Sequence, residues 1–226
     1  MARKRSRPKS LQTIWEVSDD LWTRIEPILQ ADWQPSPKGG QPPKDWRSIL
    51  NGIIHRLRSG CQWNRLPEDF GDDSTIHRWF QRWCRNGVMG RIWAAPAAEC
   101  EELGAVHWQW QSADGRLGKA RFGGKKVGKN PTDRGKPGTK SSLLVDEQGG
   151  PLGAVIDGAN VPDCKLLAAT IEAVVIDRPK PTPEDPQHLC LDKGYDNPTG
   201  RRAAAAGGHT PHIRYAASTP RRAGRT

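Results

Sequence analysis

The sequence has little that would take the protein out of the cytoplasm. No apolar run approaches the length needed to cross a membrane, and the basic N-terminal end is not followed by the apolar stretch of a secretion signal. The five cysteines are scattered, without CxxC or Cys/His metal-binding spacing, so neither a disulfide framework nor a zinc site is expected. We therefore expect a cytoplasmic protein with reduced cysteines.

Acidic residues are also in deficit. The 226 residues include 25 Asp and Glu against 35 Lys and Arg, a net charge of +10. This excess favours a polyanionic partner, of which nucleic acid is the first to consider. A basic surface that only keeps the protein soluble is the alternative that composition leaves open.

The first half of the chain has the apolar spacing of helices. The clearest helix begins after Asp45 and ends at Gly60, and another begins near residues 72–74 and ends near residues 86–87. Helices are also expected from Ser18 to residue 29, shortened or kinked at Pro27, and over residues 88–103, interrupted near Pro96. The first half therefore indicates a helical region.

One of these helices carries a row of arginines. Arg78, Arg82 and Arg85 recur at i, i+4 and i+7 and therefore lie along one side. A helix-turn-helix would place such a row against a DNA groove, whereas an ordinary solvated arginine face is the alternative. The basic composition of the whole chain favours contact with DNA.

From residue 106 onward the pattern changes to short strands. Strands are expected at residues 108–114, 141–146, 151–157, 188–191 and 212–215, and helices at 162–175 and 198–206. This order predicts a mixed sheet with flanking helices, and hence an α+β protein with an α/β-like second half.

Two aspartates follow two of these strands. Asp114 ends the first strand, and Asp192 ends the strand at 188–191, where Gly194 lets the backbone turn sharply. Ligands gather at the carboxyl ends of strands in open α/β sheets. One carboxylate cannot fix a divalent ion, but two on neighbouring strands can hold a hard cation. The alternative is that each is an ordinary aspartate of a surface turn.

A basic, glycine-rich segment separates these strands. Between Asp114 and Lys140 there are nine Lys or Arg residues, counting Lys140, and one further acid, Asp133. Its glycines are expected to keep it flexible and to let the backbone approach a ligand closely. It is not a P-loop, because no GxxxxGK[ST] motif occurs in register with a strand and a helix. The phosphate-binding candidates are Lys119, Arg121, Lys125, Lys126, Lys129, Arg134 and Lys136, with Lys193 beside the second aspartate.

Several motifs in order carry a resemblance to a known family. Residues 114–115, 123–136, 143–146, 157–160 and 191–196 resemble bacterial insertion-sequence transposases of the DDE type, in the group named after insertion sequences four and five. Residues 19–22, 60–63 and 66–67 resemble the helical region that precedes their catalytic domain. Over residues 15–214 the resemblance implies a helix-turn-helix-like region and a ribonuclease-H-like domain. It also implies binding to double-stranded DNA at the element ends, as a homodimer, in the bacterial nucleoid.

The resemblance further implies three catalytic carboxylates that hold Mg2+ (or Mn2+) for attack on a phosphodiester. Asp114 matches the first and Asp192 the second. The third is a glutamate on a later helix, but residues 197–226 contain no Asp or Glu, so we expect a truncated or frameshifted transposase. Asp196 is expected to cap a helix. The other acids of this half, Asp133, Asp146, Asp157 and Asp163, are assigned mostly to turns and caps.

The expected organisation has four parts. They are a basic, disordered arm (1–14), a helical DNA-binding region (15–104), an incomplete ribonuclease-H-like domain (105–215) and an out-of-frame, disordered tail (216–226). The leading hypothesis is a transposase impaired by loss of the third carboxylate. A catalytically inactive DNA-binding fragment or regulator is the alternative, and a basic RNA-binding protein is a third reading that leaves the two aspartates unexplained.

Overall fold

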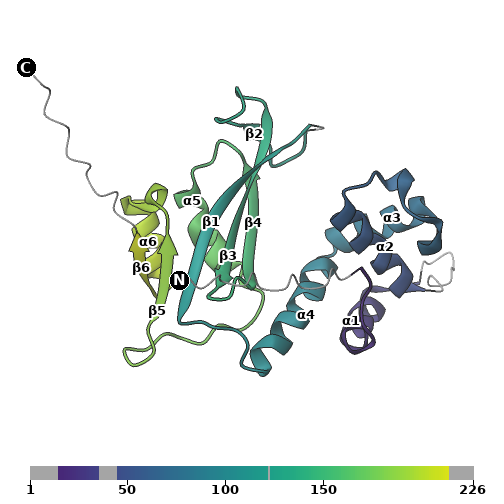
Figure 1. Ribbon diagram of the computed structural model, residues 1–226, viewed down its shortest axis with the longest axis horizontal. Coiled ribbons are helices and arrows are strands. Elements are labelled where there is room, and N and C mark those ends of the chain that lie inside the picture. The colour runs from purple at the N-terminus through teal and green to yellow at the C-terminus, as the bar shows by residue number, and fades with distance from the viewer. Residues whose placement is uncertain (1–14, 36–44, 122, 214–226) are drawn as a thin grey trace, which may run out of the picture. The chain divides into compact units, whose positions relative to one another are not determined.

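A computed structural model describes residues 15–35, 45–121 and 123–213 of the chain. The expectations of a basic arm at 1–14 and of an out-of-frame tail at 216–226 lie outside these residues. Contact between elements divides the chain into two compact units between Pro96 and Ala97, each described by itself below (Figure 1).

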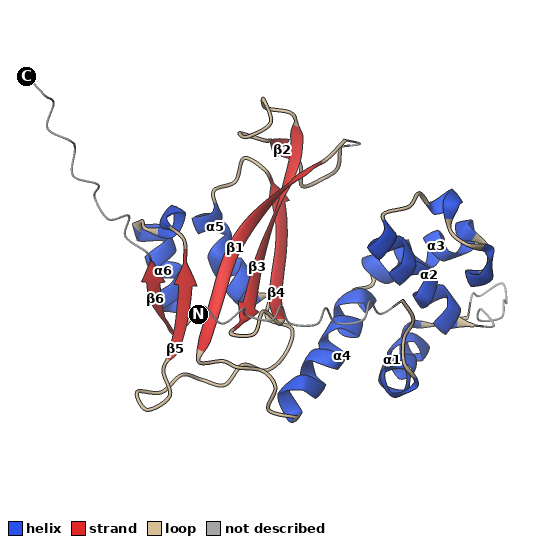
Figure 2. Ribbon diagram, viewed as in Figure 1, coloured by secondary structure: helices blue, strands red, loops and turns tan. Residues whose placement is uncertain are grey.

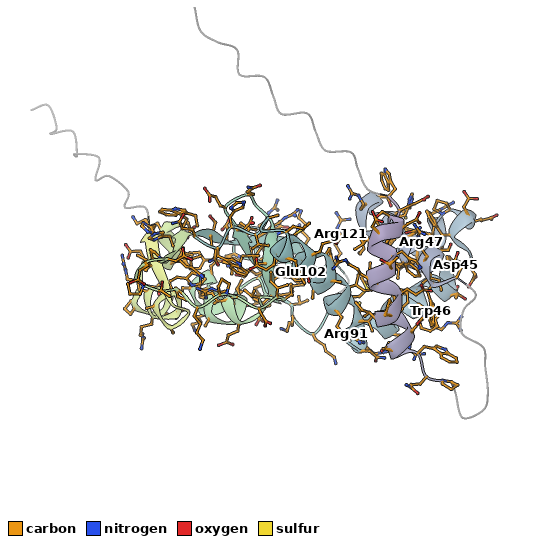
Figure 3. The ribbon with its side chains drawn as sticks, turned by 90° about the horizontal axis from the view of Figure 1, so that it is seen from below. Asp45, Trp46, Arg47, Arg91, Glu102 and Arg121 are labelled. Carbon is orange, nitrogen blue, oxygen red and sulfur yellow. The ribbon has the colours of Figure 1, made fainter. Side chains whose placement is uncertain are left out.

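The first unit is helical, as its apolar spacing predicts. The Ser18, Asp45 and Asp72 side chains each accept a hydrogen bond from a backbone amide of the first turn and so start three helices, while Gly60 ends the second in the left-handed conformation. Figure 3 labels Asp45 at the start of its helix. The elements are α1 (Asp19–Asp32), α2 (Trp46–Ser59), α3 (Asp73–Arg85), α4 (Val88–Glu102) and the 3-10 turns η1 (Trp63–Arg65) and η2 (Glu68–Phe70).

Two expected breaks in these helices are absent. Helix α1 continues past Pro27 and α4 continues past Pro96, so the predictions of shortening and interruption there are wrong. A proline removes one backbone donor, and packing of the flanking turns can offset that loss. Ile25 of α1, Ile53 of α2 and Trp83 of α3 are among the most deeply buried side chains of this core.

The second unit is a mixed sheet with helices, which confirms the expected α+β class (Figure 2). The strand order is β2-β3-β1-β5-β6, with β4 paired to β3. The β1–β3 and β3–β4 pairs are antiparallel, whereas β1–β5 and β5–β6 are parallel. The elements are β1 (Trp110–Lys119), β2 (Gly128–Lys129), β3 (Pro137–Asp146), β4 (Pro151–Gly158), α5 (Asp163–Glu172), β5 (Gln187–Leu191), η3 (Lys193–Tyr195), α6 (Pro198–Ala206) and β6 (His209–Ile213).

Helices α5 and α6 pack together on one face of this sheet. Leu166, Leu167, Thr170 and Ile171 of α5 are buried, as the apolar spacing predicts. The opposite face carries the exposed side chains of Trp110, Leu143 and Ile156. No helix among the described residues is long and apolar enough to cross a membrane.

Strand β1 is longer than the sequence predicts. It continues five residues beyond Asp114, so the prediction that Asp114 ends a strand is wrong. The glycines and basic residues of this stretch hide its strand pattern, but β3 pairs with it through Lys119 and Gly138. The hairpin of β1 and β3 therefore extends past α5, with β2 at its far end (Figure 1).

Candidate active site and nucleic-acid interface

Asp114 and Asp192 lie on neighbouring parallel strands. The last paired residues of β1 and β5 are Ser112 and Cys190, and each aspartate follows its member of that pair by two residues. Because side chains alternate along a strand, both aspartates continue the face of Ser112 and Cys190. Both are exposed to solvent. The structure thus places the two predicted site residues just beyond the last residue pair of two neighbouring strands.

Each of these aspartates is held by a nearby glycine amide. Gly115 donates its N–H to Asp114 Oδ1 at 2.7 Å, and Gly194 donates to Asp192 Oδ1 at 2.8 Å. The second bond starts the 3-10 turn η3 and so carries the chain sharply out of β5. The Asp-Gly and Asp-Lys-Gly spacings are therefore the local reason that both carboxylates have fixed positions.

A buried tyrosine links these acids to a third one. The Tyr195 side chain is fully buried, with the Ser142 side chain within hydrogen-bonding reach of its hydroxyl. Burial raises the pKa of Tyr195 well above its usual range, and the negative charges of Asp163, Asp114 and Asp192 raise it further. The charges of three carboxylates thus all act on this hydroxyl, which no sequence pattern indicates.

Asp163 is not the helix cap that the sequence predicts. Pro162 occupies the N-cap position of α5, and the Asp163 carboxylate instead accepts a hydrogen bond from Lys140 Nζ at 2.8 Å. Lys140 is only 7% exposed, so it is also unavailable to phosphate. Local spacing could not show this pair, because its members are 23 residues apart in sequence.

Asp146 and Asp196 were also predicted to lie in a turn and at a helix cap, and the structure agrees only for Asp146. Asp146 accepts hydrogen bonds from the amides of Gln148 and Gly150, which confirms its place in a turn. Asp196 is not a helix cap, because Asn197 caps α6 and Asp196 forms an ion pair with Arg201 at 2.7 Å. An amide side chain one residue further along thus takes the capping position.

The donor atoms of this site suit a hard cation. Carboxylate oxygens are the ligands that Mg2+ and Mn2+ prefer, and no imidazole or thiol is needed. Asp163, on the α5 side of β1, is already paired with Lys140. Within the described ranges, no three His, Cys, Asp or Glu side chains are grouped so that they could hold a metal ion, so Asp114 and Asp192 are a two-carboxylate candidate.

The arginine row of α3 divides into exposed and paired members. Arg78 and Arg85 are exposed, whereas Arg82 contacts Asp32 of α1 through Nε at 3.6 Å and donates to its carbonyl oxygen at 3.1 Å. Asp32 is also reached by Arg91, labelled in Figure 3. A fully solvent-facing row is therefore wrong for Arg82. The three arginines and Trp79 line a pocket of about 290 Å³.

The basic segment between β1 and β3 contains a short strand and a hydrogen-bonded turn. Strand β2 pairs with the start of β3, and the buried Asn130 side chain accepts hydrogen bonds from the amide and hydroxyl of Thr132. Residues 130–136 form a hydrogen-bonded turn after β2, with Arg134 in the left-handed region at φ 51°. Except for Lys140, the candidate basic residues are exposed: Lys119, Arg121, Lys125, Lys126, Lys129, Arg134, Lys136 and Lys193.

Part of this segment surrounds a basic pocket. Lys119, Arg121 and Lys136 line a hollow of about 350 Å³ together with Asp133. Asp133 lies 3.3 Å from Lys119 Nζ and 3.9 Å from Lys136 Nζ, so it holds both ammonium groups at the rim. The lysines outnumber this acid, and the pocket keeps a net positive charge.

Comparison with known proteins agrees with this arrangement. A family model described as a transposase DDE domain matches residues 102–225, and one described as a putative transposase of the IS4/5 family matches residues 17–93. The second unit is therefore a transposase DDE domain. The chain belongs to the insertion-sequence DDE transposases, as its motifs predict.

Three relatives match parts of the chain, the first two from Burkholderia cepacia. A putative transposase for insertion sequence element IS402 is 40% identical over 95 residues, which are 41% of this chain and 45% of that protein. An IS402 uncharacterized 16.2 kDa protein is 29% identical over 121 residues, 51% of this chain and 80% of its own length. Uncharacterized protein y4sN of Sinorhizobium fredii (strain NBRC 101917 / NGR234) is 32% identical over 86 residues, 38% of this chain and 66% of that protein. The chain thus spans under half of the first relative.

Proposed function

We propose that this chain binds the terminal inverted repeats of an insertion element and catalyses metal-dependent cleavage and strand transfer of DNA in the bacterial cytoplasm. The observation that carries the proposal is the position of Asp114 beside Asp192 at the parallel β1–β5 pair, within a domain of the DDE transposase family. We assign residues 15–104 to DNA binding and 105–215 to catalysis.

Asp114 and Asp192 would hold Mg2+ (or Mn2+), which polarises a phosphoryl oxygen and makes a hydroxyl or water a better nucleophile. The glycine amides at 115 and 194 fix one oxygen of each carboxylate, which orients the pair without using basic side chains. Hydrogen bonds from backbone amides keep acidic groups in place while a negatively charged substrate approaches.

The basic hairpin would lead the DNA backbone to this pair. Lys119 and Asp114 lie on the same strand, five residues or about 17 Å apart at the rise of an extended chain. This distance corresponds to about five nucleotides at 3.4 Å per nucleotide of duplex. A strand gripped at the pocket of Lys119, Arg121 and Lys136 can therefore reach Asp114 within one half-turn of DNA.

The helical unit offers a second DNA contact. Arg78 and Arg85 are exposed on α3, and Trp79 lines the same pocket. Arginine beside an aromatic ring suits a phosphate and a sugar or base edge. A homodimer on DNA would let two such units engage the two ends of an element.

A catalytically inactive DNA-binding protein is the second candidate. It is favoured by one observation, which is that no three His, Cys, Asp or Glu side chains of the described residues are grouped so that they could hold a metal ion. Both candidates bind DNA through the same basic surfaces, so only a test of strand cleavage separates them.

The test compares nicking with binding. Asp114→Asn and Asp192→Asn each remove a ligand charge, and Asp157→Asn is a matched control because Asp157 Oδ1 accepts from the following glycine amide at the same 2.7 Å. We expect nicking of supercoiled plasmid with Mn2+ to fall about 100-fold or more for the first two only, with binding to a mixed-sequence duplex unchanged. Binding without nicking by the unaltered chain would support the inactive protein instead.

A further inference from the structure

Helix α3 carries an uncharged amide between two exposed arginines. Arg78, Gln81 and Arg85 are exposed and recur at i, i+3 and i+7, whereas Ile76 and Trp83 on the opposite side of the helix are buried. Arginines suit phosphates, which every DNA sequence presents alike, so contacts of that kind cannot distinguish one sequence from another. Gln81 is the residue of this face whose chemistry can do so.

The Gln81 side chain is held by a neighbouring histidine. Its amide nitrogen lies 3.2 Å from Nε2 of His77, which is one helical turn earlier. The His77 ring stacks on Trp63 of η1, with ring centroids 4.6 Å apart and planes at 20°. Trp63 in turn contacts the Arg56 guanidinium, 5.3 Å from its ring centroid, and the Phe80 ring. This support reduces the side-chain entropy that Gln81 loses when its amide binds a ligand.

The contact with His77 leaves two groups of the Gln81 amide for a ligand. A neutral His77 accepts one amide hydrogen through Nε2, so the second N–H and the carbonyl oxygen have no other partner among the described residues. A donor and an acceptor side by side match N7 and N6 of adenine in the major groove of DNA. Guanine presents two acceptors there and offers no such match.

We propose that Gln81 reads the major-groove edge of an adenine while Arg78 and Arg85 contact the neighbouring phosphates, an inference that rests on the DNA binding proposed above. Helix α3 suits this position because a second helix of a helical DNA-binding unit can enter the groove with its polar face. His77 is a positioning residue, which contacts the Gln81 amide and not the DNA. Gln81 thus determines specificity, and the arginines supply affinity.

The experiment selects duplexes from a pool with a randomised central segment, using the full chain, and sequences the bound fraction. The unaltered chain should enrich a motif with an A·T pair at one fixed position. Fluorescence anisotropy then compares the enriched duplex with one in which that pair is G·C, at a single salt concentration. We expect the unaltered chain to prefer A·T about tenfold or more, and Gln81→Ala to prefer it less than about twofold.

Three further variants assign the effect. Gln30→Ala removes an exposed glutamine of α1 and should keep the full preference. Gln81→Arg offers two donors, so its preference should change to G·C. His77→Phe keeps an aromatic ring on Trp63 but lacks the acceptor, so the preference should fall partly while binding to the G·C duplex stays the same. Circular dichroism melts confirm that each variant is folded at the temperature of the titration.

The outcomes separate this inference from the proposed function. If Gln81→Ala enriches the same motif with the same preference, Gln81 is only a solvated side chain and the inference is overturned. It is also overturned if the unaltered chain binds duplex without enriching a motif, or if Gln30→Ala loses as much preference as Gln81→Ala. In each of these cases the nicking of plasmid that tests Asp114 and Asp192 can still succeed. If the unaltered chain binds no duplex at all, the proposed function itself is wrong.

Discussion

Ser112 of β1 and Cys190 of β5 face each other as the last pair of a parallel ladder, and this pair sets the positions of both proposed catalytic aspartates. A shift of either strand by one residue would turn one carboxylate to the opposite face of the sheet. The proposed site therefore depends on this register more than on any single side-chain contact.

The register can be tested by cross-linking. Ser112→Cys places a thiol opposite the natural Cys190 thiol, and we expect a short bifunctional thiol reagent to join them, as measured by mass spectrometry of tryptic peptides. Ser141→Cys is the control, because Ser141 is exposed on β3, beyond β1 from Cys190. Equal cross-linking of Cys190 in both variants would contradict the ladder.

Arg78 and Arg85 are expected to contact DNA phosphates. Replacing both by Ala should reduce the slope of log affinity against log salt by about two, since each phosphate contact contributes about one. The slope is measured by fluorescence anisotropy with a duplex over a series of salt concentrations. Arg65→Ala, at an exposed arginine of η1, should leave the slope unchanged. An unaltered slope in the double variant would make α3 an ordinary solvated face.

The Arg82 side chain is expected to raise the free energy of unfolding. Arg82→Ala removes its contacts with Asp32, whose side chain is only 7% exposed, and should lower the free energy of unfolding by about 1–3 kcal/mol. Arg78→Ala, on the same helix but exposed, should change it by less than about 0.5 kcal/mol. Urea denaturation followed by circular dichroism measures both, and equal effects would contradict the distinction.

His209 should make the protein sensitive to acid. Burial, with a contribution from the charge of Arg178, lowers the pKa of His209 to about 4, whereas a histidine of the unfolded chain titrates near 6.5. Between these two pKa values the unfolded state binds more protons than the folded state. The contribution of His209 to the free energy of unfolding is therefore fully present above pH 6.5 and is lost as the pH drops toward 4. The loss should be about 2–3 kcal/mol.

This pH dependence is isolated by comparing variants. His209→Gln removes the titrating group, so the fall in unfolding free energy between pH 6.5 and 4 should be smaller than in the unaltered chain. His212→Gln, at an exposed position of the same strand, should keep the full fall. Parallel curves for the unaltered chain and the His209 variant would show that His209 does not carry the effect.

Local patterns were sufficient for the helix starts and for the strands that precede the two aspartates. Ser18, Asp45 and Asp72 act through amides three residues away, a distance that spacing in the sequence reveals. Asp114 and Asp192 each follow an apolar strand core, and the parallel pairing of those cores brings the two together.

Long-range charge pairs could not be predicted in this way. Arg82 contacts Asp32, 50 residues away in the sequence, and Lys140 contacts Asp163, 23 residues away. Neither separation follows the periodicity of a helix or a strand. Gly115 lies within β1 and forms no turn. The reason for a glycine at this position becomes visible only when α5 packs on that strand. These tertiary contacts decide which charged side chains are free to meet a ligand.

Asp114 and Asp192 are expected to share one cation, which anomalous diffraction from Mn2+-soaked crystals of the full chain can locate. We predict an anomalous peak in contact with carboxylate oxygens of both aspartates. Crystals that show Mn2+ peaks elsewhere on the protein, with none that touches both residues, would contradict the claim.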